Sequence, residues 1–68
     1  MEKVIFAQQW KPMRAHFREW WVNLTEADLD RVSGNLDRFL ILLQVKCGYT
    51  RAQAEAELGR RVAAHEAN

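Results

Sequence analysis

The chain has 68 residues, enough for one small domain and no more. Ten basic and nine acidic residues give a formal net charge of +1, which argues against a protein whose main task is to grip nucleic-acid phosphates. The first apolar run, residues 4–7, is too short for a secretory signal or a membrane span, so we expect a cytoplasmic protein that is not attached to a membrane.

The usual reinforcements of a small domain are absent from the sequence. A single cysteine, Cys47, excludes an internal disulfide, and no group of Cys, His or acidic residues has the spacing of zinc ligands. The three glycines stand apart, so there is no glycine-rich phosphate loop. We therefore expect no cofactor, no metal and no small-molecule ligand. Oligomerisation is the remaining way to bury more apolar surface.

The first predicted helix starts near residues 10–12 and runs to about residue 22. Pro12 suits the first turn of a helix, where its missing N–H would have no partner anyway. Residues 1–9 carry no helix-start signal, so we expect a flexible or loosely docked N-terminal segment.

A capping box marks the start of the second predicted helix. The Thr25 side chain can accept a hydrogen bond from the Asp28 backbone, and the Asp28 side chain can accept one from the Thr25 backbone. Leu24 and Leu29 are placed to close a hydrophobic staple over the same corner. This helix should end near Ser33, before a left-handed Gly34.

The third and fourth predicted helices span residues 35–47 and 51–64. Gly48 ends the third helix, and Thr50 with Gln53 repeats the capping-box pattern before the fourth. Residues 65–68 should form a frayed tail.

These elements predict an all-α fold, a single small domain of four short helices packed as a helical bundle over residues 10–64. The apolar spacing also predicts the core. Its expected members are Trp10, Met13, Phe17, Trp21, Leu24, Leu29, Val32, Leu36, Phe39, Leu40, Leu43, Tyr49 and Leu58.

The order of residues over positions 10–58 resembles the CsbD-like family of small bacterial stress-associated proteins, without gaps. The residues that carry the resemblance are Trp10, Met13, Phe17, Trp21, the run 24–30, Gly34, Asp37, Gln44, Gly48, Ala54 and Glu55. The resemblance implies a non-enzymatic cytoplasmic protein of the general stress response.

The outer face of the third helix departs from what the resemblance implies, which is small or charged residues. Ile41, Leu42 and Val45 lie opposite the inner stripe of that helix, and Trp20 is a further unexpected apolar residue. A helix that is apolar all round must be covered all round. We therefore predict a homo-oligomer, with these four residues as the candidate oligomer or partner face.

Other chemistries are weaker readings of the same residues. Cys47 continues the inner apolar stripe of the third helix and lies at its C-terminal end, where the helix dipole disfavours a thiolate. We therefore interpret Cys47 as a packing residue. His16 reads as a solvated helix face, and the carboxylates at 26, 28 and 30 lack the spacing of a calcium loop. We therefore expect no enzyme.

The alternative function is a nucleic-acid-binding accessory protein. Its candidate platform combines tryptophans with cations on the first helix, because aromatic side chains can stack on bases while cations contact phosphates. The residues concerned are Trp10, Trp20, Trp21, Lys11, Arg14 and Arg18. Tryptophans at this spacing are more often core, so we favour a self-associating interaction module.

Overall fold

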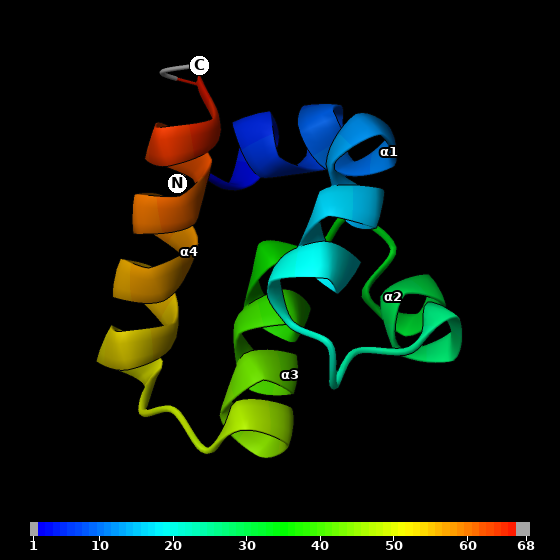
Figure 1. Cartoon of the computed structure of the whole chain (residues 1–68). Coiled ribbons are helices and arrows are strands. Elements are labelled where there is room, and N and C mark those ends of the chain that lie inside the picture. Colours follow the sequence, from blue (N-terminus) through cyan, green and yellow to red (C-terminus); the bar gives the residue numbers. More distant parts are fainter. Residues whose placement is uncertain (1, 67–68) are drawn as a thin grey trace.

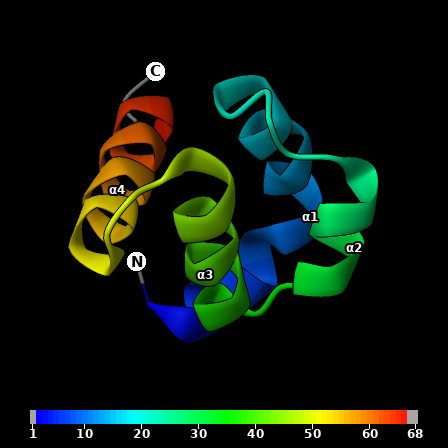
Figure 2. The same cartoon turned by 90° about the horizontal axis from the view of Figure 1, so that it is seen from below.

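Four helices joined by short corners make up the computed structural model of the chain, which describes residues 2–66 (Figure 1). They are α1 (Lys3–Trp20), α2 (Glu26–Val32), α3 (Leu36–Cys47) and α4 (Arg51–Glu66). No strand occurs within residues 2–66, so the predicted all-α class is confirmed. Seen from below, α3 lies in the middle, with α4 on one side and α1 and α2 on the other (Figure 2).

The predicted start of the first helix at residues 10–12 is wrong, because α1 already begins at Lys3. Its N-cap residue, Glu2, makes no side-chain capping hydrogen bond. The Phe6 side chain, however, is 1% exposed, and its ring lies 5.4 Å from the ring of Phe39. Burial of Phe6 therefore holds the first turns. The expected flexibility of residues 1–9 and the domain boundaries 10–64 stay predictions, and Met1 lies outside the described residues.

Pro12 accordingly lies inside α1, not at its start. Proline removes a backbone hydrogen bond and bends a helix, and α1 changes direction along its length in Figure 1. Both Pro12 and Gln8, whose carbonyl loses its intrahelical donor, are exposed to water. The aromatic contacts on the inner side of α1 offset the loss of the backbone hydrogen bond that Pro12 cannot donate.

The corner before α2 is built as the sequence predicts. The Asp28 backbone N–H donates to Thr25 Oγ1 at 3.1 Å, and the Thr25 backbone N–H donates to Asp28 Oδ2 at 3.1 Å. Leu24 and Leu29, the predicted staple pair, are both buried. The reciprocal capping box is therefore confirmed.

Left-handed residues end α2 and α3. Gly34 has φ +81° and Gly48 has φ +72°, as predicted. Ser33, the residue that caps α2, also has a positive φ of 49°, which the sequence did not indicate. The positive φ is the reason for glycine at position 34, since a Cβ there would make only an ordinary van der Waals contact with Trp10 Cβ, at 3.5 Å. The corner thus passes in close contact with α1.

The start of α4 is also as predicted, and its end lies further along. The Gln53 backbone N–H donates to Thr50 Oγ1 at 3.1 Å, and the Thr50 N–H donates to Gln53 Oε1 at 2.9 Å. The helix continues to Glu66, past the predicted end at residue 64, and the expected fraying of residues 65 and 66 stays a prediction. Residues 67 and 68 lie outside the described residues.

Phe39 of α3 is the centre of the core. Its ring lies 4.7 Å from Phe17, 5.8 Å from Trp21 and 6.1 Å from Trp10, all of α1 or its C-cap. Of the predicted core residues only Tyr49 is not fully buried, and it accepts a hydrogen bond from Trp21 Nε1 at 3.3 Å. The predicted core is otherwise confirmed. The observed core also contains three residues that the predicted list omits, which are Phe6, Ala54 and Val62.

Candidate interaction groove

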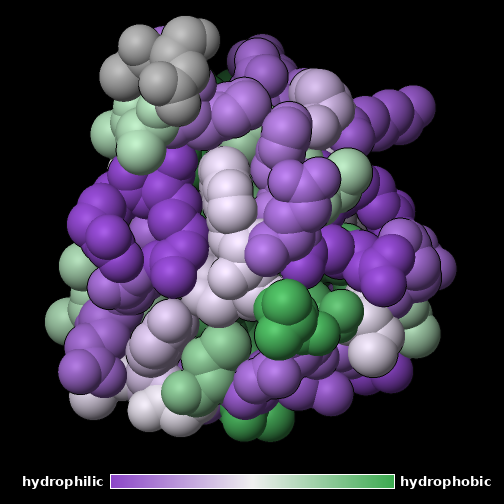
Figure 3. Space-filling view, in the orientation of Figure 1, coloured by the Kyte–Doolittle hydropathy of each residue, from purple (hydrophilic) through white to green (hydrophobic). Residues whose placement is uncertain are grey.

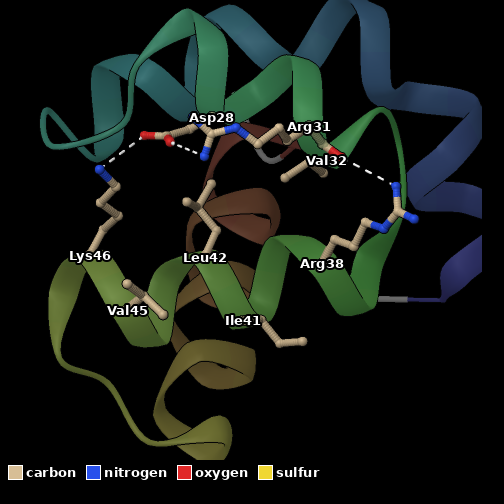
Figure 4. Close-up of a pocket in the computed structure, with 8 residues that line it drawn as sticks. All are labelled: Asp28, Arg31, Val32, Arg38, Ile41, Leu42, Val45 and Lys46. Carbon is tan, nitrogen blue, oxygen red and sulfur yellow. Dashed lines mark hydrogen bonds and ion pairs between the residues drawn. The ribbon is translucent and has the colours of Figure 1, made fainter.

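An open groove of about 710 Å³ lies between α2 and α3 (Figure 4). Its apolar lining consists of Val32 from α2 and Ile41, Leu42 and Val45 from α3. Leu42 points from α3 toward α2 and packs partly against the core. Ile41 and Val45 remain 52% and 75% exposed. We call this surface the α2–α3 groove.

Three cations, Arg31, Arg38 and Lys46, also line the α2–α3 groove. The Arg31 guanidinium lies 3.5 Å from Asp28 Oδ1, and Lys46 Nζ lies 3.4 Å from Asp28 Oδ2. Arg38 donates to the backbone carbonyl of Arg31 at 3.4 Å and has no carboxylate partner within residues 2–66. One carboxylate thus balances one of three cations, which leaves two unmatched positive charges around an apolar floor.

Asp28 links the groove to the corner before α2. Its side chain is only 3% exposed. The hydrogen bond from the Thr25 backbone N–H, followed by smaller contributions from the Thr25 side chain and from Lys46, holds the pKa of Asp28 below its ordinary value, although burial opposes this shift. The carboxylate is therefore ionised and keeps Lys46 on the rim of the groove.

The structure brings together three of the four predicted face residues. Ile41, Leu42 and Val45 line the α2–α3 groove, whereas Trp20 does not. The Trp20 ring lies 5.8 Å from His16 and 6.0 Å from His65, at the contact between α1 and α4. Trp20 therefore lies apart from the groove residues, and its place in the candidate oligomer or partner face stays a prediction. The role of the face in oligomers stays a prediction.

Two features were not anticipated from the sequence. The first is the pairing of His16 with His65, whose ring centroids lie 4.4 Å apart, so His16 does not simply face solvent. The second is the basic rim. Arg38 and Lys46 flank Ile41 and Val45 at helical spacing, so this part could have been found in the α3 pattern. Arg31 joins them only because α2 packs beside α3.

The nucleic-acid platform suggested by the sequence is not assembled on α1. Arg14 donates to Glu26 at 2.7 Å and to Asp30 at 2.9 Å, and Arg18 donates to Glu26 at 2.6 Å. These cations are engaged within the chain. Two of the three tryptophans, at positions 10 and 21, are buried. Of the six platform residues, Lys11 is exposed without an ion pair in residues 2–66 and Trp20 is only partly buried, whereas the other four are buried or engaged within the chain.

The remaining chemistry-bearing residues do not form a reactive centre in the part of the chain described. Cys47 is half-buried, and burial raises the pKa of its thiol despite the opposing charge of Arg61. No group of three or more His, Cys, Asp or Glu side chains between residues 2 and 66 is placed to hold a metal ion. None of the helices in that range combines the length and the hydropathy that crossing a bilayer requires.

Figure 3 shows the hydropathy of one face of the molecule. On the face drawn in Figure 3, hydrophilic residues predominate and hydrophobic colour is confined to small separate areas. Fold and groove together define a small all-α protein with an open, apolar groove that basic side chains border.

The chain belongs to the UPF0337 family, the CsbD-like proteins. It is 34% identical over 58 residues to a UPF0337 protein of Bordetella pertussis, an alignment that covers 85% of this chain and 88% of the relative. It is 35% identical over 57 residues to a UPF0337 protein of Protochlamydia amoebophila, covering 84% and 86%. It is also 33% identical over 49 residues to the UPF0337 protein YjbJ of Escherichia coli K12, covering 72% and 71%. The resemblance seen in the sequence is therefore confirmed.

The names of these relatives assign them no activity. No family model matches the chain. No solved structure matches it either.

Proposed function

We propose that this protein is a non-enzymatic, cytoplasmic stress-response protein that acts as a self-associating helical interaction module. The observation that carries the proposal is the exposure of Ile41 and Val45 beside half-buried Leu42 in an open groove. The stress context comes from the CsbD-like resemblance. Self-association comes from the physical cost of this apolar surface.

The energetic argument compares the groove with the stability of so small a domain. Covering an aliphatic side chain stabilises by about 1.5–3 kcal/mol relative to full exposure. A domain of this length has a free energy of unfolding of roughly 3–10 kcal/mol. Covering Ile41 and Val45 in a second copy would therefore add a large fraction of the total. A second copy is also the partner always present at the protein's own concentration.

Sedimentation equilibrium over a micromolar concentration series tests the proposal. The wild-type mass should rise above the 8.0 kDa of one chain as concentration increases. Val45→Glu should remain a monomer, because it places a carboxylate on the apolar floor. Leu42 is a poorer target, since it also packs against the core.

Val22→Glu is the matched control for this experiment. Val22 is 86% exposed and lines no part of the groove, so this variant should associate like the wild type. A wild-type mass of one chain at every concentration would contradict self-association.

Nucleic-acid binding remains the second candidate, and the observation in its favour is the unmatched cation Arg38 among the cations of the groove rim. Phosphate contacts release counterions, so binding to a labelled DNA or RNA oligonucleotide should weaken steeply with salt. Arg38→Gln should reduce that salt dependence. Absence of binding at low salt would exclude this candidate.

A further inference from the structure

A second exposed apolar surface lies where the two ends of the described chain meet. Ile5, at the start of α1, lies beside Val62 and Ala63, near the end of α4, around a shallow hollow of about 240 Å³. The carboxylate residues Glu2 and Glu66 line the same hollow, and no cation does. Ile5 is 45% exposed. We call this surface the acidic patch.

The two carboxylates of the acidic patch differ from the others in the chain. Within residues 2–66, neither Glu2 nor Glu66 has an ion-pair partner. The remaining acidic side chains are each placed within 4.0 Å of a cationic or histidine nitrogen of the same chain. They are Glu19, Glu26, Asp28, Asp30, Asp37, Glu55 and Glu57. Glu19 faces only His16, which carries a charge only when it is protonated. The acidic patch is thus the place in the described chain where two carboxylates without a cationic partner lie around one hollow.

The acidic patch and the α2–α3 groove are complementary. One combines an exposed isoleucine with two unmatched carboxylates, and the other combines exposed Ile41 and Val45 with two unmatched positive charges. Opposite charge around matching apolar surfaces favours association and fixes its orientation. Complementarity of this kind points to one surface binding the other.

The two surfaces can be used at the same time by one molecule. They share no lining residue. The start of α1 and the end of α4 lie on one side of the molecule in Figure 1, and α2 lies on the other. Since the two surfaces belong to one chain and share no lining residue, the complementary partner is a second copy.

A two-fold pairing of groove with groove is the competing arrangement. It would bring the Arg31, Arg38 and Lys46 of both copies to one interface, with only the two Asp28 carboxylates to balance them. Like charges at close range repel, and desolvation of the interface strengthens the repulsion. The charge distribution therefore disfavours the symmetric dimer that the exposed α3 face alone would suggest.

We propose that the protein self-associates head to tail, with the acidic patch of one copy seated in the α2–α3 groove of the next. This inference rests on the proposed self-association and specifies its geometry. Ile5 contacts the apolar floor of the groove, and the carboxylates of Glu2 and Glu66 lie among its cations. In a head-to-tail dimer, one copy still has a free groove and the other still has a free acidic patch. Further copies can therefore add to the dimer unless the assembly closes into a ring.

Two variants, each with one altered surface, test this geometry. Val45→Glu alters the groove and leaves the acidic patch intact, whereas Ile5→Glu alters the patch and leaves the groove intact. Both replaced side chains are exposed, so both variants should keep the wild-type circular dichroism spectrum. Both add the same sign of charge, so the two altered surfaces repel each other and cannot form a second contact.

Head-to-tail association gives a distinctive result in sedimentation equilibrium. Each variant alone should associate at least ~10-fold more weakly than the wild type, because a charge facing an apolar surface is costly. Their equimolar mixture should form a complex of twice the mass of one chain, 8.0 kDa, and should stop there. A mixture of Val22→Glu with Val45→Glu tests the effect of an unrelated charge. Val22→Glu keeps both surfaces intact, so this mixture should not stop at the mass of two chains.

The outcomes separate this inference from the proposed function. A wild type that associates, together with an Ile5→Glu variant that associates equally well, would overturn the head-to-tail geometry and leave self-association standing. The same holds if the two variants stay monomeric when mixed. A wild type that remains a monomer at all concentrations would overturn both proposals.

Discussion

The starts of α1 and α2 are held in opposite ways. At α2, hydrogen bonds between Thr25 and Asp28, three residues apart, satisfy the first turn locally. At α1, Glu2 makes no side-chain cap, and the first turns are held by the contact of Phe6 with Phe39 of α3. A helix start can therefore be specified by its own residues or by packing against a distant one, and only the first kind is visible in a short window of sequence.

The largest expected effect comes from removing the packing at α1. Phe6→Ala should lower the free energy of unfolding by about 3–5 kcal/mol, because it deletes a fully buried aromatic ring and leaves a cavity. In a domain this small the loss approaches the whole stability. Urea denaturation followed by circular dichroism measures it. Val4→Ala is the control, since Val4 is 58% exposed and should change stability little.

The capping box should contribute less. Thr25→Ala should cost about 1 kcal/mol, the usual scale for an N-cap side chain. In a domain of this length that corresponds to a fall of roughly 4–8 °C in melting temperature. Thr25→Ser keeps the hydroxyl acceptor and should recover most of the loss. Equal melting temperatures for the alanine variant and the wild type would contradict the role assigned to the corner.

Acid should weaken the same corner through Asp28. Its pKa is lowered in the folded protein, chiefly by the Thr25 backbone hydrogen bond, so the ionised form stabilises the fold above the unfolded pKa of about 3.9. That stabilisation is lost as the pH falls through the lower, folded pKa. The wild type should therefore be more stable than Asp28→Asn at neutral pH, and the difference should shrink on acidification.

The difference between these two proteins isolates Asp28 from the other carboxylates. Glu26, Asp37 and Glu57 also have lowered pKa values, through hydrogen bonds to basic side chains, and they titrate in both proteins. Chemical denaturation of both proteins at several pH values gives the difference directly. A difference that does not change with pH would show that the charge of Asp28 plays no part.

The smallest effect should come from the ion pair that crosses between the two helices. Arg18 donates to Glu26 at 2.6 Å, but both side chains are largely exposed and solvent screens their attraction. Arg18→Gln should therefore leave the melting temperature close to that of Lys11→Gln. Lys11 is exposed and has no ion pair within residues 2–66. A clear loss specific to Arg18 would assign this contact a structural role equal to the cap.

The same distinction explains what the sequence could and could not predict. Corners at Thr25, Gly48 and Thr50 depend on neighbours a few residues away, so the boundaries there were predicted closely. The start of α1 depends on Phe39, far along the chain, and Pro12 pointed to the wrong boundary. Phe6 does extend the helical apolar spacing of Trp10, Met13 and Phe17, but no capping residue precedes it, and Pro12 was given more weight than this spacing.

The candidate groove shows the same division. Ile41, Leu42 and Val45 follow from the period of α3 alone and were predicted. Trp20 does not line the groove, because its environment is set by how α1 meets α4. The contribution of Arg31, and the acidic patch formed by the two chain ends, arise only when the helices are assembled.

The bend of α1 at Pro12 has a consequence for how so short a chain encloses its interior. A straight helix meets a neighbour along one line of contact. In α1, Phe6 before the bend and Phe17 after it both reach Phe39, with ring separations of 5.4 and 4.7 Å. One helix therefore forms two walls of the enclosure. A chain of 68 residues gains the coverage of a fifth helix without the residues that another connecting loop would occupy.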